Sequence, residues 1–376
     1  MSLVLDRIGL KRGDEVHIAD ASLELHAGSM NVLLGPTLSG KTTLMRLMAG
    51  LDRPTSGRLV EDGRDVTGLG VKHRSVAMVY QQFVNYPTLS VYENIASPLR
   101  VQGLPKAEIE SRVARAAKLM RLEPMLKRTP AQLSGGQQQR TALARALVKQ
   151  AKLVLLDEPL ANLDYKLREE LREELPRIFA ETGAILVYAT TEPAEALLLR
   201  GSTATLREGR ITQVGPSAAL YREPGNLDAA RVFSDPPLNE LALTVSNGVA
   251  ALADGSRLPG DGALGALPDG AATLGFRADA AAAAVAVGGD GRDPSHPAFP
   301  GTVAVTEISG SESFVHIATD AGLGTLVCLV EGVHAFEPGD RAEARLDLAR
   351  AFAFGADGRR IAARPAAAPR REPVPA

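Results

Sequence analysis

A glycine-rich stretch near the N-terminus contains the residue types that bind phosphate. In NVLLGPTLSGKTTLMRLMAG, Gly35 is followed after four residues by Gly40, Lys41 and Thr42. The glycines let successive backbone N–H groups turn toward phosphate oxygens, and a helix N-terminus adds positive potential. In this pattern the lysine reaches the β- and γ-phosphates, and the threonine hydroxyl binds Mg²⁺. An apolar strand before the stretch and an apolar-faced helix after it argue against a chance glycine turn. The predicted nucleotide-binding residues of this cradle are Gly35, Pro36, Thr37, Ser39, Gly40, Lys41, Thr42 and Thr43.

Two adjacent carboxylates end an apolar strand further along the chain. In LVLLDEP, four apolar residues precede Asp157 and Glu158. Ligands collect at the carboxyl ends of strands in α/β folds, so we predict that Asp157 binds the metal together with Thr42. Glu158, beside the γ-phosphate, could orient and polarise the attacking water as a general base. Without other motifs, Asp157 and Glu158 would be interpreted as a solvated acidic turn after a strand. The phosphate cradle upstream favours the catalytic interpretation instead.

A second pair of glycines opens a polar helix between these two motifs. The stretch LSGGQQQR places Ser134, Gly135, Gly136 and Gln137 at a helix N-terminus, where backbone N–H groups attract anions. The chain already has one phosphate cradle. A second one therefore indicates a second nucleotide, bound across a dimer.

The segments that must position these motifs follow an α/β pattern. Apolar strands alternate with helical stretches that have long polar faces, which predicts a largely parallel sheet covered by helices. The expected strands are residues 30–34, 76–79, 153–156 and 184–188, and the expected helices are 106–122 and 137–149. Residues 85–150 would form a helical subdomain.

The last third of the chain has a different character. After FSDPPLN (233–239) the sequence becomes rich in Gly, Ala, Pro and Asp, and short β-branched runs are separated by turns. This pattern predicts a small β-barrel or sandwich over residues 236–362, after a first domain of residues 1–235. The alanine run 280–284 is interpreted as a helical turn or a surface segment. Residues 363–376 cannot bury enough apolar surface to order, so a flexible tail is expected.

Composition excludes several classes of function. The 376 residues include 42 basic and 44 acidic side chains, so no global basic field would attract nucleic acid. No apolar run approaches the roughly 20 residues of a membrane-spanning helix, and the N-terminus lacks a signal-peptide layout. A single cysteine, Cys328, is compatible with a reducing compartment and is expected to be a small core residue.

Taken in order, the motifs resemble the ATP-binding cassette (ABC) family. The cradle, Gln81 in MVYQQ, the LSGGQ stretch, LLDEP and the ANLD turn ending at Asp164 occur in that family's order and spacing over residues 1–235. The resemblance implies two cassettes that sandwich ATP and Mg²⁺ between one P-loop and the other's LSGGQ signature. It also implies that Gln81 contacts the metal and the attacking water, and that Asp164 braces the dimer interface.

The C-terminal part is similar to the OB-like accessory domain of carbohydrate importers, on the evidence of LGFRADA and GTVAVTEISGSESFVHI. Several longer stretches, among them YATTEP and NLDYKLREELREELP, resemble an ATPase subunit of bacterial glycerol importers. The resemblance implies an ATPase at the cytoplasmic face of the inner membrane, held there by two permease subunits and served by an extracytoplasmic substrate-binding protein. Its cargo would be glycerol, with glycerol 3-phosphate or another polyol or sugar as alternatives.

Two positions depart from the family pattern at the nucleotide site. Thr191 in VYATTEPAEA occupies the position of the family's switch histidine, and a threonine cannot share a proton at neutral pH. Arg12 lies 23 residues before Gly35, where the family stacks an aromatic side chain on adenine. Alternatively, Thr190 or a water replaces the histidine, Arg12 is an ordinary exposed arginine, and His17 is a less favoured substitute.

Both departures fall on the P-loop side, whereas the signature is intact. The sequence therefore favours a heterodimer with a second ATPase subunit, in which the site at this chain's own P-loop is impaired, and pairing with a second copy of this chain is the alternative. A regulatory ATP-binding module that seldom hydrolyses ATP is the alternative. DNA clamps that share the cassette are excluded, because roughly fifty residues between Gln81 and the signature leave no room for long coiled coils.

The segment after Gln81 is more apolar than a solvent loop requires. In the family, the stretch corresponding to 85–100 helps to line the groove that receives a short helix of the membrane subunit. The aromatic residues Phe83, Tyr86 and Tyr92 would contribute to this surface. The alternative is that at least one of them packs in the core.

Overall fold

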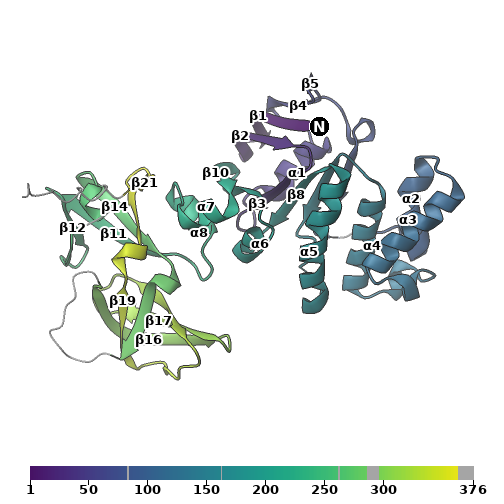
Figure 1. The fold of residues 1–376 in the computed structure, drawn as a ribbon. Helices are drawn as coiled ribbons and strands as arrows, with labels where there is room; N and C mark the ends of the chain where they lie inside the picture. The colour runs from purple at the N-terminus through teal and green to yellow at the C-terminus, as the bar shows by residue number, and fades with distance from the viewer. Residues whose placement is uncertain (83, 162, 261–262, 286–295, 363–376) are drawn as a thin grey trace, which may run out of the picture. The chain divides into compact units, whose positions relative to one another are not determined.

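The computed structural model describes residues 1–82, 84–161, 163–260, 263–285 and 296–362. They gather into two compact units, Met1–Arg222 and Glu223–Ala376 (Figure 1). This division differs from the expected boundary after residue 235, because Ala230 packs against Phe352 and Phe354 of the second unit. The expected flexible tail, residues 363–376, lies outside the described residues.

Strands and helices alternate along the first unit (Figure 1). Its strands are β1 (Ser2–Arg12), β2 (Glu15–His26), β3 (Met30–Leu34), β4 (Ser56–Glu61), β5 (Arg64–Asp65), β6 (Val76–Val79), β7 (Leu153–Asp157), β8 (Ile185–Thr190), β9 (Ser202–Arg207) and β10 (Arg210–Pro216). Its helices are α1 (Lys41–Ala49), α2 (Val91–Val101), α3 (Lys106–Leu119), α4 (Gly135–Val148), α5 (Tyr165–Thr182), α6 (Pro193–Leu198) and α7 (Ser217–Arg222). None of the helices in the described residues is both long and apolar enough to cross a membrane.

Two sheets share one core in the first unit. The larger sheet has the order β10-β9-β3-β8-β7-β6, and its strands are parallel except for β10. The smaller sheet, β2-β1-β4-β5, is antiparallel. Buried side chains of α1 join the two sheets in a single apolar cluster. Helices α2, α3 and α4 pack on one another and form a separate group at one end of this unit (Figure 1).

The expected elements of the first unit are present, with small shifts at their ends. Residues 30–34 and 76–79 form β3 and β6 as predicted. The helix expected over 137–149 begins earlier, at Gly135, because the Ser134 side chain caps its first turn by accepting a hydrogen bond from the backbone N–H of Gln137.

The second unit consists mainly of antiparallel strands. They are β11 (Asn239–Ser246), β12 (Val249–Leu252), β13 (Arg257–Leu258), β14 (Gly270–Phe276), β15 (Ala281–Val285), β16 (Ala298–Ile308), β17 (Glu312–Thr319), β18 (Thr325–Glu331), β19 (Arg341–Leu346), β20 (Phe352–Gly355) and β21 (Arg360–Ile361), preceded by helix α8 (Leu227–Val232). The sheets β13-β12-β11-β14-β20-β21 and β15-β19-β16-β17-β18 bury one common cluster, which includes Cys328. The expected all-β unit and the core position of its cysteine are confirmed.

The alanine run of the second unit is a correction to the sequence analysis. A 3₁₀ turn, η5 (Ala278–Ala280), leads into strand β15, so most of residues 280–284 is neither helical nor a free surface segment. The strand pairs antiparallel with β19, opposite residues 342–346, and Ala281 is buried in the shared core. Pairing with a neighbouring strand overrides the high helix propensity of alanine.

Candidate active site

The phosphate cradle is the turn between β3 and α1. Gly40 has a φ of 101° at the start of α1, a conformation that favours glycine. At Gly35, a Cβ atom would lie 2.4 Å from the Leu206 carbonyl oxygen and 2.6 Å from the Ser39 hydroxyl oxygen. The Ser39 hydroxyl is buried without a hydrogen-bond partner among the described residues. A tight glycine turn and an unpartnered hydroxyl fit a loop that binds phosphate.

Lys41 lies inside this cradle and is only 5% exposed. Its ammonium group donates hydrogen bonds to the carbonyl oxygens of Gly35 (2.7 Å) and Pro36 (3.0 Å), and it lies 3.9 Å from a carboxylate oxygen of Glu158. Burial lowers the pKa of Lys41, while the carboxylates of Glu158 and Asp157 oppose this shift. The loop thus holds the Lys41 ammonium group between the glycine turn and the two acidic residues.

The first of these acidic residues is paired with the cradle. Asp157 ends β7 and is 2% exposed, and its carboxylate accepts a 2.7 Å hydrogen bond from the Thr42 hydroxyl. Burial raises the pKa of Asp157, and the Thr42 hydrogen bond opposes the shift. The described residues contain no group of three or more His, Cys, Asp or Glu that could enclose a metal. Hydroxyl and carboxylate oxygens nevertheless suit Mg²⁺, which takes few protein ligands and completes its shell with water and phosphate.

The second acidic residue meets Gln81 across a long sequence separation. The Gln81 side-chain amide donates a 2.9 Å hydrogen bond to the Glu158 carboxylate, although 77 positions separate the residues. Burial raises the pKa of Glu158, and the Lys41 ammonium opposes the shift. Glu158 has a φ of 46°, and its backbone N–H donates to the Ala189 carbonyl at 3.0 Å. A non-glycine residue held in this conformation is a feature that clusters at functional sites.

The turn after β8 carries both threonines of the TTEP stretch. Thr191 is exposed and makes no hydrogen bond within the described part of the chain. Thr190 is buried, donates to the Glu195 carboxylate at 2.6 Å, and accepts from the backbone N–H of Glu192 at 3.0 Å. The Thr190 hydroxyl therefore already uses its donor and one acceptor position in hydrogen bonds within the chain. For this reason it does not fit the alternative in which Thr190 replaces the histidine. Pro193 begins α6, so the bend expected at this point is present.

Arg12 shares the carboxylate of Asp52 with a second arginine, Arg46. Its guanidinium donates a 3.2 Å hydrogen bond to Asp52, which also accepts two hydrogen bonds from Arg46. The Arg12 side chain is 59% exposed at the end of β1. This geometry favours the interpretation of Arg12 as an ordinary surface arginine over that of an adenine-stacking residue.

The signature lies at the start of α4. Ser134 and Gln137 form a capping box, in which each side chain accepts a hydrogen bond from the other residue's backbone N–H. Gly135 and Gly136 follow in the first turn, where exposed N–H groups remain available to an anion. Asp164 caps α5 by accepting from the Leu167 N–H at 3.0 Å. No hydrogen bond or ion pair of the described residues joins Ser134–Gln137 to the cradle.

Helix α4 holds the segment that follows Gln81 through one side chain and one backbone carbonyl. Arg145 donates to the Val84 carbonyl at 2.6 Å, and its guanidinium lies 5.0 Å from the centre of the Tyr86 ring. The Gln138 carbonyl accepts a 2.9 Å hydrogen bond from the Asn85 side chain. Tyr86 is 49% exposed, so it presents its ring at the surface instead of filling the core. Phe83 lies outside the described residues.

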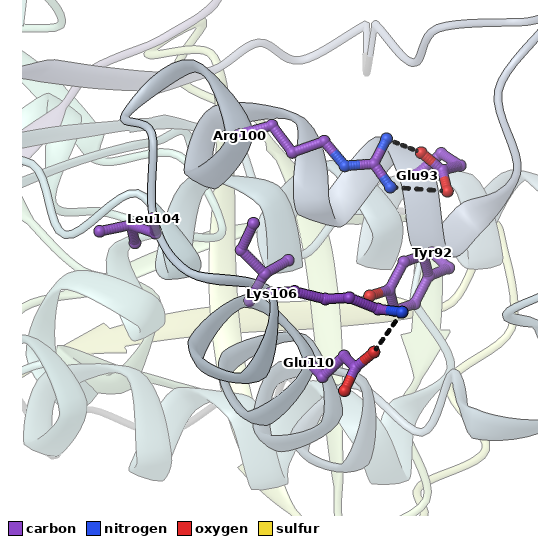
Figure 2. Close-up of a pocket in the computed structure, with 7 residues that line it drawn as sticks. Tyr92, Glu93, Arg100, Leu104, Lys106 and Glu110 are labelled. Atoms are coloured by element: carbon purple, nitrogen blue, oxygen red, sulfur yellow. Dashed lines mark hydrogen bonds and ion pairs between the residues drawn. The ribbon is translucent and has the colours of Figure 1, made fainter.

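A pocket of about 510 Å³ lies between α2 and α3 (Figure 2). Two ion pairs frame it, Arg100 with Glu93 and Lys106 with Glu110, and the ring of Tyr92 contributes to its wall (Figure 2). The residues that line it are Tyr92, Glu93, Arg100, Leu104, Lys106, Ile109 and Glu110. Charged rims around a partly apolar hollow are compatible with a protein-docking surface.

Comparison with known proteins places this site in a family. The ABC transporter family matches residues 18–161, and the TOBE domain matches residues 297–352. The sn-glycerol-3-phosphate import ATP-binding protein UgpC of Chromohalobacter salexigens is 37% identical over 341 residues, which cover 90% of each chain. The chain belongs to the ABC transporter family of import ATPases.

Two further relatives are similar over most of both chains, and a solved cassette is similar over a part of this chain. UgpC of Rhizobium meliloti is 37% identical, over 93% of this chain and 96% of the relative. The osmoprotective compounds uptake ATP-binding protein GgtA of Synechocystis is 34% identical, over 85% of this chain and 88% of the relative. The solved ATP-binding cassette MJ0796, in a dimeric post-hydrolysis state bound to ADP and Pi, is 27% identical with a TM-score of 0.53. It matches 57% of this chain and 98% of its own.

The ABC import ATPase is therefore an ATP-binding enzyme coupled to transport, with a cassette followed by an OB-like TOBE domain. The resemblance to carbohydrate-importer ATPases is confirmed. The names of these relatives refer to glycerol 3-phosphate or to osmoprotective compounds, so the preference for glycerol stays a prediction.

Sequence reasoning missed a group of buried polar residues behind the TTEP turn. Glu195 and Arg172 form an ion pair of 2.9 Å next to Thr190, and both side chains are almost fully buried. The only sequence signal was the Glu-Ala pair in TEPAEA, which served to align the turn. An ion pair between two helices depends on how the helices pack, so the local sequence around the turn does not reveal it.

Proposed function

We propose that this chain energises the uptake of glycerol or a related polyol, with glycerol 3-phosphate as the principal alternative. It would work at the cytoplasmic face of the inner membrane, bound to two permeases. An extracytoplasmic substrate-binding protein would deliver the cargo to these permeases. The similarity to glycerol-3-phosphate importers over most of both chains supports the class of cargo. The observation that carries the proposal is a complete cradle, in which Lys41 pairs with Glu158 and Thr42 donates to Asp157. The exposed Thr191 lies in the turn after β8, which is hydrogen-bonded to this cradle.

Each residue of the site has a role in this proposal. Lys41 and backbone N–H groups of the 35–43 loop would bind the phosphates, and the oxygens of Thr42 and Asp157 would hold Mg²⁺ with the help of Gln81. When bound, Mg²⁺ supplies charge neutralisation at the β- and γ-phosphate oxygens. Glu158, which the Gln81 amide holds, orients and polarises the attacking water.

The site at this chain's own P-loop is impaired in this proposal. Thr191 is shorter than histidine and cannot share a proton. The loss of one preorganised transition-state donor costs about 2.7 to 4 kcal/mol, or about 10² to 10³ in rate. Ser134–Gln137 keeps the full signature, so this chain would complete a competent site on a second, histidine-bearing ATPase subunit, with Asp164 at the interface.

Coupling to the permease would pass through α4. The helix carries the signature at its N-terminus and holds residues 84–86 through Gln138 and Arg145. A change at the signature, on dimer closure or opening, therefore moves the surface formed by Tyr86 and the pocket of α2 and α3. The different affinities of the two states for nucleotide supply the driving force.

The experiment that tests this proposal compares the hydrolysis rates of the purified chain alone and with a histidine-bearing partner cassette. We expect slow hydrolysis by the chain alone, and a rise of about 10² on Thr191→His. Thr191→Asn is the matched control, because asparagine adds polar bulk without a titratable nitrogen. Brisk hydrolysis by the lone chain that Thr191→His leaves unchanged would overturn the impaired site.

The cargo is tested separately, by uptake of labelled glycerol and glycerol 3-phosphate in cells with and without the gene for this chain. Loss of glycerol uptake alone supports the first candidate, and loss of glycerol 3-phosphate uptake alone supports the second. The exposed Thr191 also favours a regulatory ATP-binding subunit as a second candidate function. That candidate requires tight ATP binding with no gain of hydrolysis on addition of any partner cassette.

A further inference from the structure

A buried polar cluster lies directly behind the turn that carries Thr191. Glu195 of α6 accepts hydrogen bonds from the Tyr188 hydroxyl (3.1 Å), the Thr190 hydroxyl (2.6 Å) and the Arg172 guanidinium (2.9 Å). The Glu195 side chain is 6% exposed and that of Arg172 is 11% exposed. Two helices and a central strand therefore meet on one carboxylate.

A carboxylate at this depth requires compensation. Removing a charge from water is costly unless the charge is paired and hydrogen-bonded. Arg172 supplies the opposite charge, and two hydroxyl groups complete the shell around Glu195. Burial raises the pKa of Tyr188 well above its usual value, so its hydroxyl keeps its proton and donates. The Glu195 carboxylate is thus satisfied by three donors, although the Nε of Arg172 is buried without a hydrogen-bond partner among the described residues. This arrangement favours a single conformation of the turn.

Backbone hydrogen bonds connect this turn to the nucleotide site. The carbonyl of Thr190, whose hydroxyl binds Glu195, accepts from the N–H of Gly35, the first cradle glycine, at 3.3 Å. The preceding carbonyl, of Ala189, accepts from the N–H of Glu158 at 3.0 Å. A displacement of β8 at this point would therefore move the cradle and the general base together.

A second connection leads from the cluster to the turn that precedes α5. Glu192 lies 3.3 Å from Arg172 and 3.8 Å from Arg168. Arg168 also donates a 3.2 Å hydrogen bond to the carbonyl of Ala161, in the turn that leads to Asp164. The α5 arginines thus tie the Thr190–Glu192 turn to the segment that follows the catalytic carboxylates.

We propose that Glu195 and Arg172 are a positioning pair, which fixes Thr190 and through it the cradle glycine Gly35 and the general base Glu158. Neither residue touches nucleotide in this proposal. The pair acts by holding the β8 turn in register with the active site. It would operate in the natural chain and in any variant that restores a histidine at position 191.

The test uses two substitutions that separate shape from hydrogen bonding at Thr190. Thr190→Val keeps the shape and removes the hydroxyl, while Thr190→Ser keeps the hydroxyl. In the importer assembled with its permeases, we expect Thr190→Val to lower kcat about tenfold, because small misplacements of catalytic groups are costly. The KM for ATP should change by less than about twofold, since the other cradle contacts remain. Thr190→Ser should recover most of the lost kcat.

A remote buried ion pair provides the control for stability. Glu195→Gln removes the charge that faces Arg172, and Glu61→Gln does the same to Arg74, whose side chain is 1% exposed and lies 3.3 Å from Glu61. We expect both variants to lower the Tm, and Glu195→Gln alone to lower kcat. Equal kcat in Glu195→Gln and Glu61→Gln, or an unchanged kcat in Thr190→Val, would overturn the proposal.

Each variant is made both in the natural chain and in the Thr191→His chain. If Thr191 impairs the site, the effect of Thr190→Val is measured in the histidine background, where hydrolysis is faster. If Thr191→His changes nothing, the impaired site is wrong, and the same comparison is made in the natural chain. Failure of the positioning pair is thereby distinguished from failure of the proposed function.

Discussion

The two anion-binding helix starts of the ATPase domain are built differently. At the P-loop, Lys41 and Asp157 are almost fully buried, and Glu158 occupies a left-handed backbone conformation. At the signature, Ser134 and Gly135 are exposed, and a capping box pairs only the backbone N–H groups of Ser134 and Gln137. The first site is therefore preorganised within one chain. The second presents free N–H groups that only an incoming nucleotide and a partner cassette would bury.

The two sides also differ in how their sequences depart from the family. Thr191 and Arg12 both belong to the P-loop side, and the structure leaves Thr191 without a partner in the described residues and ties Arg12 to Asp52. The signature side shows no departure. This contrast supports the proposed division of labour between an impaired site and a competent one, and the predictions below test it.

The largest effect is expected on the signature side. Ser134→Ala should lower ATP hydrolysis of the assembled importer about 10²-fold, because it removes a preorganised donor from the competent site. Loss of the helix cap should cost about 1 kcal/mol of unfolding free energy. Steady-state ATPase assays and urea unfolding measure the two effects.

The control for this prediction is another helix cap. Asn226 accepts from the N–H of Ala229 at the start of α8, in the second unit. Asn226→Ala should cost a similar unfolding free energy and leave hydrolysis within about twofold of the natural chain. If both variants lose activity to the same extent, the signature has no special role.

On the P-loop side, Gly35→Ala should lower the free energy of unfolding by about 1 to 3 kcal/mol, because the new methyl group would overlap the Leu206 carbonyl. Gly68→Ala is the matched control, since a Cβ at that position meets nothing within 4 Å. Urea unfolding of the two variants checks the difference. Equal stabilities would show that the glycine turn is not tightly packed.

The buried carboxylate of the P-loop side gives a pH-dependent prediction. Burial raises the folded-state pKa of Asp157 above its unfolded value, so the charged form is destabilising above the folded pKa. This cost disappears as the pH falls below the unfolded value. Asp157→Asn should therefore raise the Tm of nucleotide-free protein by about 2 °C at neutral pH and have less effect in acid. It should also abolish Mg²⁺-dependent stabilisation by ATP.

Thermal scans across the pH range, with and without Mg²⁺ and ATP, test this prediction. The corresponding change on the signature side, Gln137→Ala, removes no buried charge and should give a Tm shift that does not depend on pH. A pH-independent gain for Asp157→Asn would contradict the assignment of the cost to its charge.

The smallest effect is expected for Arg12→Ala. The exposed ion pair with Asp52 contributes about 0 to 1 kcal/mol, and Asp52 keeps its two hydrogen bonds with Arg46. The dissociation constant for ATP should change by less than about twofold. Titration with a fluorescent ATP analogue measures it, and a tenfold loss of affinity would restore Arg12 as a base-stacking residue.

Periodicity and apolar runs located much of the fold. The strands that lead into the motifs, β3, β6 and β7, are mostly apolar because both faces of a parallel sheet are covered. The prediction of a helical turn or surface segment for the alanine run 280–284 was wrong. Most of this run forms β15, whose strand conformation depends on its partner β19, more than fifty residues away in the sequence. Local composition carries no information about such pairing.

The sequence alone predicted most of the chemistry of the candidate active site. The predicted roles of Gly35 and Gly40 depend on backbone conformation, and that of Lys41 depends on its short spacing from these glycines, which a linear pattern records. Only the tertiary structure decided that Gln81 meets Glu158, that Asp52 holds Arg12, and that Glu195 engages Thr190. These contacts join different elements, and their geometry depends on how helices and strands pack. A single sequence does not specify that packing position by position.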